Sequence, residues 1–290
     1  MLAYLIHLAI LIGIYFVLAL SLQVALGFTG LLNLGHIAFY CIGAYTSALL
    51  VLHGFPFWVS FILAPIHALL WGYFLSLPTR RLKQDYLALA TLAFSFIIYS
   101  VALNWVSLTR GPLGLPGISR PSIFGFKLSN NLSYLIFTLF FTLLTFFSIY
   151  RVTSSPFGRV LEAIRDNELA VKILGKNTAR MKSYALMISA FFAGLAGSLY
   201  AYYITFIDPS SFTLSQLIPI LCIVIIGGLA TLKGTFLATL LIVLLPEPLR
   251  FIGLPSSIVG PLRQIIYGTL LLLILIYKPK GFCGRIEKIE

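Results

Sequence analysis

Residues 183–205 read SYALMISAFFAGLAGSLYAYYIT, a run that contains no charged residue. About 20 apolar residues in helical conformation are long enough to cross the hydrocarbon core of a bilayer. Lipid offers the backbone no hydrogen-bonding partner, so a spanning segment of this kind has to be helical. Small residues recur at every fourth position in two stripes, which include Gly194 and Gly197. The stretch therefore predicts a transmembrane helix that packs closely against other helices.

The rest of the chain has the same apolar character. Hydrophobic residues make up 60% of the 290 positions and charged residues only 10%, whereas soluble domains have about 25% charged residues. The sequence predicts an all-α, polytopic transmembrane helical bundle of about nine spans in a single domain, residues 1–290. The expected spans are 2–22, 31–52, 57–77, 86–105, 132–150, 183–205, 215–232, 235–250 and 263–277. The first is interpreted as a span and not as a signal peptide, because no Lys or Arg precedes its apolar run.

The basic residues predict an orientation. If nine spans alternate, 15 of the 20 Lys and Arg residues fall on one side of the membrane. The positive-inside rule makes that side cytoplasmic, so we expect the N-terminus outside and the C-terminus in the cytoplasm. Because these charges flank apolar spans, the net charge of +12 indicates contact with lipid headgroups and not with nucleic acid. The fifteen residues are Arg80, Arg81, Lys83, Arg151, Arg159, Arg165, Lys172, Lys176, Arg180, Lys182, Lys233, Lys278, Lys280, Arg285 and Lys288.

Two loops are long. The extracytoplasmic loop 106–131 is rich in Gly and Pro, which predicts irregular backbone. The cytoplasmic loop 151–182 predicts a short amphipathic helix that begins at a serine followed by Pro156 and stops at Gly175. Its apolar stripe would consist of Val160, Ile164, Val171 and Leu174, and its water- or partner-facing charges of Glu162, Arg165, Asp166 and Glu168.

Within that helix Glu168 and Lys172 can pair across one turn. A helix that rests on the membrane surface usually has a strongly basic polar face. This one has charges of both signs, which favours docking to a protein. Asn177 or Thr178 is expected to cap the following helix.

Residues 27–50, GFTGLLNLGHIAFYCIGAYTSALL, combine glycines with polar residues inside a span. Broken helices at membrane depth are tolerated where they line a cavity, and polar residues there indicate function. We expect Asn33 and His36 to share one helical face, which Tyr40 extends and to which Tyr45 and Thr46 add polarity. These five residues are the candidate translocation pathway. The alternative is that Asn33 and His36 bond buried carbonyls and only fix helix packing. Gly227 and Gly228 are expected to allow helix packing or a bend.

Several functional signatures are missing from the sequence. It contains no G-x-x-x-x-G-K-[ST] phosphate loop, no H-E-x-x-H and no G-x-S-x-G, which argues against an enzyme with its own ATP site. Cys41, Cys222 and Cys283 have neither zinc nor disulfide spacing, and no metal or cofactor is expected. An ion-coupled secondary transporter would carry carboxylates at mid-membrane, and none is convincing here. A catalytic constellation for a membrane enzyme is also not found.

Two stretches, residues 27–50 and LEAIRDNELAVKILGKN at 161–177, resemble the permeases of branched-chain amino acid ABC importers, in their M-type form. Further stretches, TRGPLGLPGI, SAFFAGLAGSLYAYY, FIDPSSF and GGLATLKG, follow in the family's order. The resemblance implies a transport subunit that translocates branched-chain amino acids, while similar permeases serve urea or short amides, so the solute stays open.

The resemblance also implies partners and a location. These are a second homologous permease, two cytoplasmic ATPases that hydrolyse ATP and an extracytoplasmic solute-binding protein, in the plasma (inner) membrane of a prokaryote. The Gly- and Pro-rich segment 110–118 of the outer loop would face the binding protein. The residues implied to belong to the segment that couples to the ATPases are Glu162, Ala163, Arg165, Asp166, Glu168 and Gly175.

Overall fold

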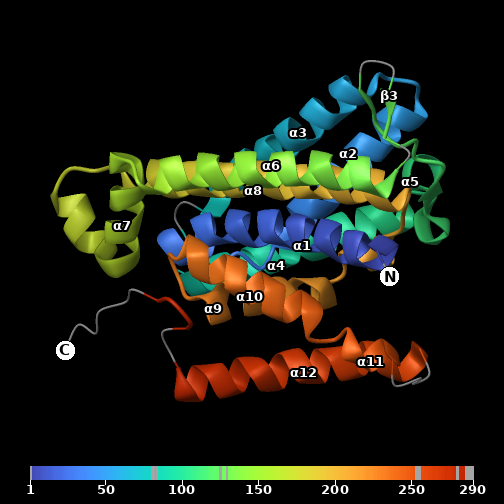
Figure 1. The fold of residues 1–290 in the computed structure, drawn as a ribbon. Coiled ribbons are helices and arrows are strands. Elements are labelled where there is room, and N and C mark those ends of the chain that lie inside the picture. The colour runs from blue at the N-terminus through green and yellow to red at the C-terminus, as the bar shows by residue number, and fades with distance from the viewer. Residues whose placement is uncertain are drawn as a thin grey trace.

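The computed structural model describes residues 2–79, 82, 84–123, 126–128, 130–251, 256–278 and 281–284. Long helices lie side by side in a bundle, and one helical segment, α7, projects from one end (Figure 1). The helices are α1 (Leu2–Leu22), α2 (His36–Leu52), α3 (Phe57–Thr79), α4 (Gln84–Asn104), α5 (Val106–Thr109), α6 (Asn131–Thr153), α7 (Pro156–Ile173), α8 (Thr178–Ile204), α9 (Leu217–Gly227), α10 (Leu232–Leu244), α11 (Pro248–Phe251) and α12 (Ser256–Tyr277).

Short elements complete the fold. A π-helix, η1 (Gln23–Phe28), continues α1, and 3-10 turns occupy η2 (Gly111–Leu113), η3 (Pro209–Phe212) and η4 (Leu214–Gln216). At the end of the bundle opposite α7, strand β1 (Leu115–Pro116) pairs antiparallel with β4 (Phe206–Ile207), with Leu115 opposite Ile207. Strands β2 (Ser122–Ile123) and β3 (Phe126–Lys127) form a second antiparallel pair. The pairing of β1 with β4 ties the loop 106–131 to the end of α8.

The core of the bundle is α8, which packs against α1, α2 and α3. Its contacts are so close that glycine is needed on both sides. A Cβ added at Gly43 of α2 would lie 2.2 Å from the Gly194 carbonyl oxygen, and one at Gly197 would lie 2.2 Å from the Tyr40 carbonyl oxygen. Backbones that approach this closely gain dispersion contacts along their length, which is the main packing force between helices in lipid.

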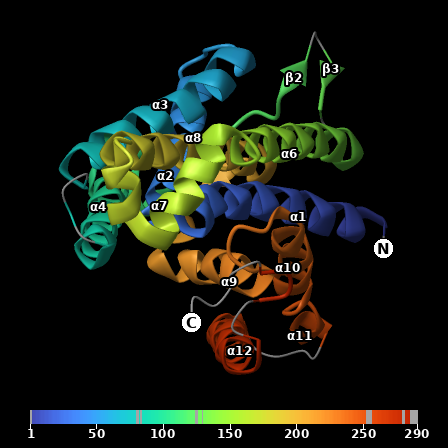
Figure 2. The ribbon, with the colours of Figure 1, turned by 90° about the vertical axis from the view of Figure 1, so that its left-hand side faces the viewer.

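The periphery shows the apolar surface that lipid requires. Large hydrophobic side chains on α3, α4 and α6 are exposed, among them Phe74, Phe96 and Phe147. Six described helices are long and apolar enough to cross a membrane, and α2, α9 and α10 are shorter apolar helices. The chain is therefore an all-α, polytopic membrane protein. Helix α12 lies apart from the main bundle and contacts it chiefly through α9 (Figures 1 and 2).

Three of the expected spans differ from the structure. The span 31–52 is wrong at its start, because residues 29–35 are irregular and the helix begins only at His36. The expected spans 215–232 and 235–250 contain helices of 11 and 13 residues. At 1.5 Å per residue these are about 16 and 20 Å long, which is less than the roughly 30 Å of a bilayer core. The 3-10 turn η4 directly precedes α9, and a turn separates α10 from the short helix α11.

The start of α1 and the segment α7 mark opposite ends of the bundle (Figure 1). The C-terminal end of α12 lies at the same end as α7. Some of the charges used to predict orientation lie outside the described residues: Arg80, Arg81, Lys83, Lys280, Arg285 and Lys288.

The glycine contact between α2 and α8 leads to the first prediction. Gly43→Ala should destabilise the protein by about 1–3 kcal/mol, the usual cost of overpacking, because the added methyl meets rigid backbone of Gly194. The measurement is the temperature at which monodisperse protein is lost in detergent. Gly268→Ala is the matched control, because a Cβ at Gly268 meets nothing within 4 Å. Equal melting temperatures for the two variants would contradict the packing argument.

Candidate functional site

Segment α7 leaves the bundle at one end and faces the viewer in Figure 2. It begins at Pro156 and is followed by Gly175, whose φ of +75° suits a helix stop. It is not one continuous helix, since Asn167 has φ −155° and ψ 96°. The Asn167 Oδ1 accepts a hydrogen bond of 3.1 Å from the backbone N–H of Ala170, which caps the second half. Asn177 caps α8 by accepting from Arg180 N–H.

Arg165 lies against its own chain, although the sequence predicted that it faces water or a partner. Its Nη1 donates a 2.9 Å hydrogen bond to the Gly27 carbonyl in η1, and its Nε pairs with Asp166 at 2.9 Å. The aliphatic part of its side chain covers Gly30, where an added Cβ would lie 3.0 Å from Arg165 Cγ. Arg165 is thus a direct contact between α7 and the end of α1.

Glu168 also bonds within its own chain, while its side chain stays 32% exposed. Its carboxylate binds Lys182 at 2.5 Å, Lys172 at 3.0 Å and the Thr178 hydroxyl at 3.0 Å. Partial burial raises the pKa of Glu168, but the bonds from Lys182, Lys172 and Thr178 outweigh it and leave the pKa below its usual value. The stabilisation is therefore fully present above the unfolded pKa of about 4.3 and is lost as the pH falls through the lower folded value.

Segment α7 exposes charged residues, among them Arg159, Asp166 and Lys172, and a group of apolar residues at its C-terminal end. Leu169, Ile173 and Leu174 are 70%, 85% and 77% exposed. Leu174 was expected on the apolar stripe with Val171, but Val171 is buried and Leu174 is exposed, because the helix ends at Ile173 and Leu174 is its C-cap. Exposed apolar residues grouped on one surface indicate a binding site for another protein or for lipid. Of the other predicted coupling residues, Ala163, Asp166 and Gly175 are exposed and Glu162 is half-buried.

Gln23, at the start of the π-helix η1, is a buried residue that the sequence analysis did not single out. Its Nε2 donates to the Gly228 carbonyl and to the Thr235 hydroxyl, both at 2.9 Å, and its Oε1 accepts from Ala230 N–H at 3.1 Å. These bonds provide partners for backbone C=O and N–H groups where the chain turns between α9 and α10. Gly228 has φ +98° at that turn. The end of α1 therefore contacts α7 on one side and the α9–α10 turn on the other.

The predicted translocation residues divide into separate environments. Asn33 precedes α2, so it does not share a helical face with His36, and its Oδ1 accepts from Gly35 N–H at 3.1 Å. The Nε2 of His36 lies 3.0 Å from Ser21 Oγ and 3.1 Å from the Leu18 carbonyl oxygen. Both side chains are buried, and Asn33 Nδ2 and His36 Nδ1 have no hydrogen-bonding partner in the described part of the chain.

Tyr45 and Thr46 also point in different directions. The Tyr45 ring lies 5.8 Å from that of Phe212. The Thr46 hydroxyl lies 2.8 Å from Nδ1 of His67 on α3, toward the outer surface of the bundle. Of the five predicted residues, only Tyr40 lines the central cavity.

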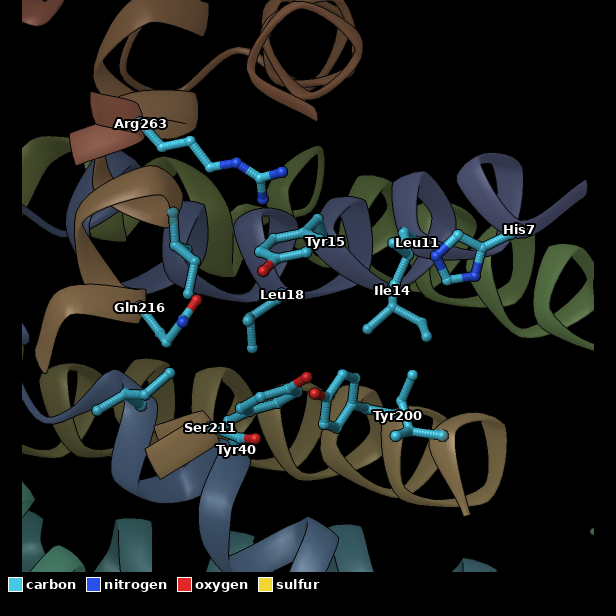
Figure 3. A pocket seen from close by; sticks show the side chains of 13 residues that line it. His7, Leu11, Ile14, Tyr15, Leu18, Tyr40, Tyr200, Ser211, Gln216 and Arg263 are labelled. Atoms are coloured by element: carbon cyan, nitrogen blue, oxygen red, sulfur yellow. The ribbon is translucent and has the colours of Figure 1, made fainter. Parts of the chain in front are cut away.

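This cavity of about 290 Å³ lies between α1, α2, α8, α9 and α12. Figure 3 shows Arg263 reaching in from one wall toward Tyr15, with Tyr40, Tyr200 and Ser211 on the opposite wall. Arg263 is one of the five basic residues that the orientation prediction leaves on the outer side, and the sequence predicts no role in a cavity for Tyr15, Tyr200 or Gln216. These residues come from distant parts of the chain, so no local pattern identifies them. The described residues contain no group of His, Cys, Asp and Glu that could hold a metal ion.

Comparison with known proteins identifies the family. The family model described as branched-chain amino acid transport system / permease component matches residues 4–275. The chain belongs to this family. It is therefore a membrane permease component, as the sequence motifs predicted.

Curated relatives are similar over most of their length. A high-affinity branched-chain amino acid transport system permease protein LivM of Escherichia coli is 36% identical over 301 residues, which cover 95% of this chain and 69% of that protein. The Salmonella typhimurium protein of the same description is 36% identical over 92% of this chain and 67% of its own length. A probable branched-chain amino acid transport permease protein LivM of Methanocaldococcus jannaschii is 29% identical over 93% and 90%. No solved structure matches the chain significantly.

The bonds of Glu168 lead to a second prediction. Glu168→Gln should loosen the connection between α7 and α8, because an amide no longer pairs with two lysines. Trypsin should then cleave at Lys176 and Arg180 severalfold faster, since cleavage follows the population of locally opened chain. The measurement is the rate of fragment appearance from purified protein at neutral pH.

Glu162→Gln is the matched control for this experiment. It makes the same change of charge on the same helix, and Glu162 forms no ion pair within the described residues. If both variants are cleaved at the wild-type rate, Glu168 does not hold the two helices together.

Proposed function

We propose that this chain is the M-type membrane subunit of an ATP-driven importer of branched-chain amino acids. The observation that supports it most is the family match over residues 4–275, combined with a projecting segment whose apolar residues are free to bind a partner. The importer would contain a second homologous permease, two cytoplasmic ATPases and an extracytoplasmic solute-binding protein. It would reside in the plasma (inner) membrane of a prokaryote.

The proposed topology has nine crossings, with the N-terminus outside and the C-terminus in the cytoplasm. Helices α9 and α10 make two of these crossings together with the non-helical backbone beside them. The position of α7 and the end of α12 opposite the start of α1 supports an odd number of crossings (Figure 1). The loop 106–131 then lies outside, where it would contact the solute-binding protein.

In the proposed coupling mechanism, one ATPase subunit docks on Leu169, Ile173 and Leu174. When the two ATPase subunits close on each other around ATP, the docked subunit moves α7. Arg165 transmits this movement to the carbonyl of Gly27, and Gln23 transmits it onward to the α9–α10 turn. The bundle would then alternate between outward and inward access, because packed interfaces switch between discrete arrangements. Glu168 keeps α7 attached to α8 throughout. Charged residues thus act within the chain, and apolar residues act between chains.

The docking surface gives a third prediction. Ile173→Asp should weaken binding of the ATPase subunits by at least about tenfold, because a charge replaces an apolar anchor at the centre of the contact. The measurement is co-purification of the ATPases with the tagged permease from membranes. The ATPases are cytoplasmic, so if they co-purify with the wild type and not with Ile173→Asp, the result also supports a cytoplasmic position of α7. Unchanged co-purification of Ile173→Asp, with insertion intact, would argue against docking at this surface.

Arg165 gives a fourth prediction of a different kind. Arg165→Gln should leave the ATPases bound and hydrolysing ATP while leucine uptake into proteoliposomes falls, because the contact with Gly27 is lost and the docking residues are retained. The readout is the ratio of leucine transported to ATP hydrolysed. Arg159→Gln, at an exposed position of the same helix, should leave the ratio at the wild-type value. If leucine uptake and ATP hydrolysis by Arg165→Gln decline in proportion, Arg165 contributes to binding of the ATPase and not to transmission of its movement.

A further inference from the structure

We propose that the central cavity is a binding site for the zwitterionic head of an apolar amino acid, in which Arg263 holds the carboxylate. This proposal rests on the proposed import function and adds the residues that would recognise the solute. It depends on three observations: a cation with an unpaired buried nitrogen, a set of neutral groups that can accept hydrogen bonds from an ammonium, and an apolar wall.

Arg263 is the first observation. Its Nε is buried and has no hydrogen-bonding partner in the described part of the chain, and its side chain extends into the cavity toward Tyr15 (Figure 3). No Asp or Glu is among the residues that line this cavity. A guanidinium in a low-dielectric site without a counter-ion is costly, and a bound carboxylate would compensate through charge-assisted, fork-shaped hydrogen bonding. The site therefore lacks one negative charge.

The opposite wall suits the ammonium group. Tyr40, Tyr200 and Ser211 lie there and present aromatic faces and hydroxyl oxygens (Figure 3). Aromatic faces attract cations, and hydroxyl oxygens accept hydrogen bonds from an ammonium. Behind this wall, Ser211 donates a 2.5 Å hydrogen bond to the carboxylate of Asp208. The negative charge of Asp208 polarises the Ser211 hydroxyl, whose oxygen becomes a better acceptor. The two walls thus have opposite electrostatic character, as the two ends of a zwitterion require.

The remaining walls are mainly apolar. Their apolar residues are Leu11, Ile14, Leu18, Ile37, Ile204 and Ile220, and His7 and Gln216 are the polar residues among them. At about 290 Å³ the cavity is at the small end of the roughly 300–1,000 Å³ found for small-molecule sites. It can accept one small solute with a branched apolar side chain. A neutral polar solute such as an amide would leave the Arg263 charge without a partner.

The first test uses the wild-type chain, purified at full length in lipid nanodiscs, and needs no variant. L-leucine should raise the thermal unfolding temperature in a concentration-dependent way, because a ligand that binds only the folded state stabilises it. L-leucinamide, which lacks the carboxylate, and 4-methylpentanoate, which lacks the ammonium, should both give a clearly smaller shift at equal concentration. Equal shifts for leucine and leucinamide, or no shift with leucine, would overturn the proposal.

The second test uses variants in the complete transporter in proteoliposomes. Arg263→Gln should raise the leucine concentration for half-maximal uptake by about tenfold to a hundredfold, in line with the loss of one or two hydrogen bonds to a charged group. Arg263→Lys should retain part of the affinity, because it keeps the charge and loses the fork. Lys233→Gln is the control, since it removes a positive charge at an exposed position away from the cavity.

The outcomes separate this inference from the function on which it rests. If the wild-type transporter imports leucine and Arg263→Gln does so with unchanged concentration dependence, the binding site is refuted and the import function stands. If the wild-type transporter imports no amino acid, the proposed function fails. If the effect of Arg263→Gln appears only in vesicles that contain phosphatidylglycerol and not in phosphatidylcholine alone, the guanidinium binds a lipid headgroup and the proposal is overturned. If Arg263→Gln does not insert into the membrane, the proposal is tested by the affinity of Arg263→Lys for leucine and by the thermal shifts with leucine, leucinamide and 4-methylpentanoate.

Discussion

The structure depends on one constraint, which is that the membrane interior supplies no hydrogen-bonding partners to the backbone. Wherever a helix stops inside the bundle, another part of the protein has to satisfy the exposed N–H and C=O groups. Gln23 does this for the turn between α9 and α10, with its amide bound to Gly228, Ala230 and Thr235. The side chain of a residue near the start of the chain thereby allows two short helices to exist near its end.

This constraint also explains why the end of α1 is a centre of contacts. The π-helix η1 offers a free carbonyl at Gly27, which Arg165 binds from α7, while Gln23 holds the α9–α10 turn from within the same six residues. π-helical turns inside helices frequently mark functional positions, because they leave backbone groups available to partners. The end of α1 is therefore hydrogen-bonded both to α7 and to the α9–α10 turn. Helix α1 also lines the central cavity through Leu11, Tyr15 and Leu18.

Some polar residues bond within the chain while apolar residues are exposed. On the projecting segment α7, Glu168 binds within the chain and the leucines and isoleucine are exposed. In the membrane part, large apolar side chains cover the outside and Arg263 lies at the cavity. An ionisable residue among membrane helices is costly unless it serves a partner or a ligand. Both arrangements leave groups whose interactions are incomplete until another molecule binds.

Residue periodicity and composition were sufficient for those features that depend on neighbours in sequence. The lengths of apolar runs predicted the membrane helices, Pro156 and Gly175 marked the ends of α7, and the pairing of Glu168 with Lys172 followed from their spacing. These features are local, because a helix brings together residues three or four positions apart. The start of α2 at His36 was missed, since residues 29–35 satisfy their backbone through turns and side-chain bonds that periodicity does not represent.

Contacts between residues far apart in the sequence were determined only by the tertiary structure. Gln23 and Gly228 are 205 positions apart, and Arg263 meets Tyr15 and Tyr40 at a cavity built from five helices. Likewise, Leu174 is exposed although Val171 is buried, because the helix ends at Ile173 before the apolar stripe is complete. A sequence of apolar helices determines that the chain enters the membrane, because transfer of apolar surface is a property of each segment alone. Which polar residues face one another is determined by how the segments pack, and packing depends on all of them together.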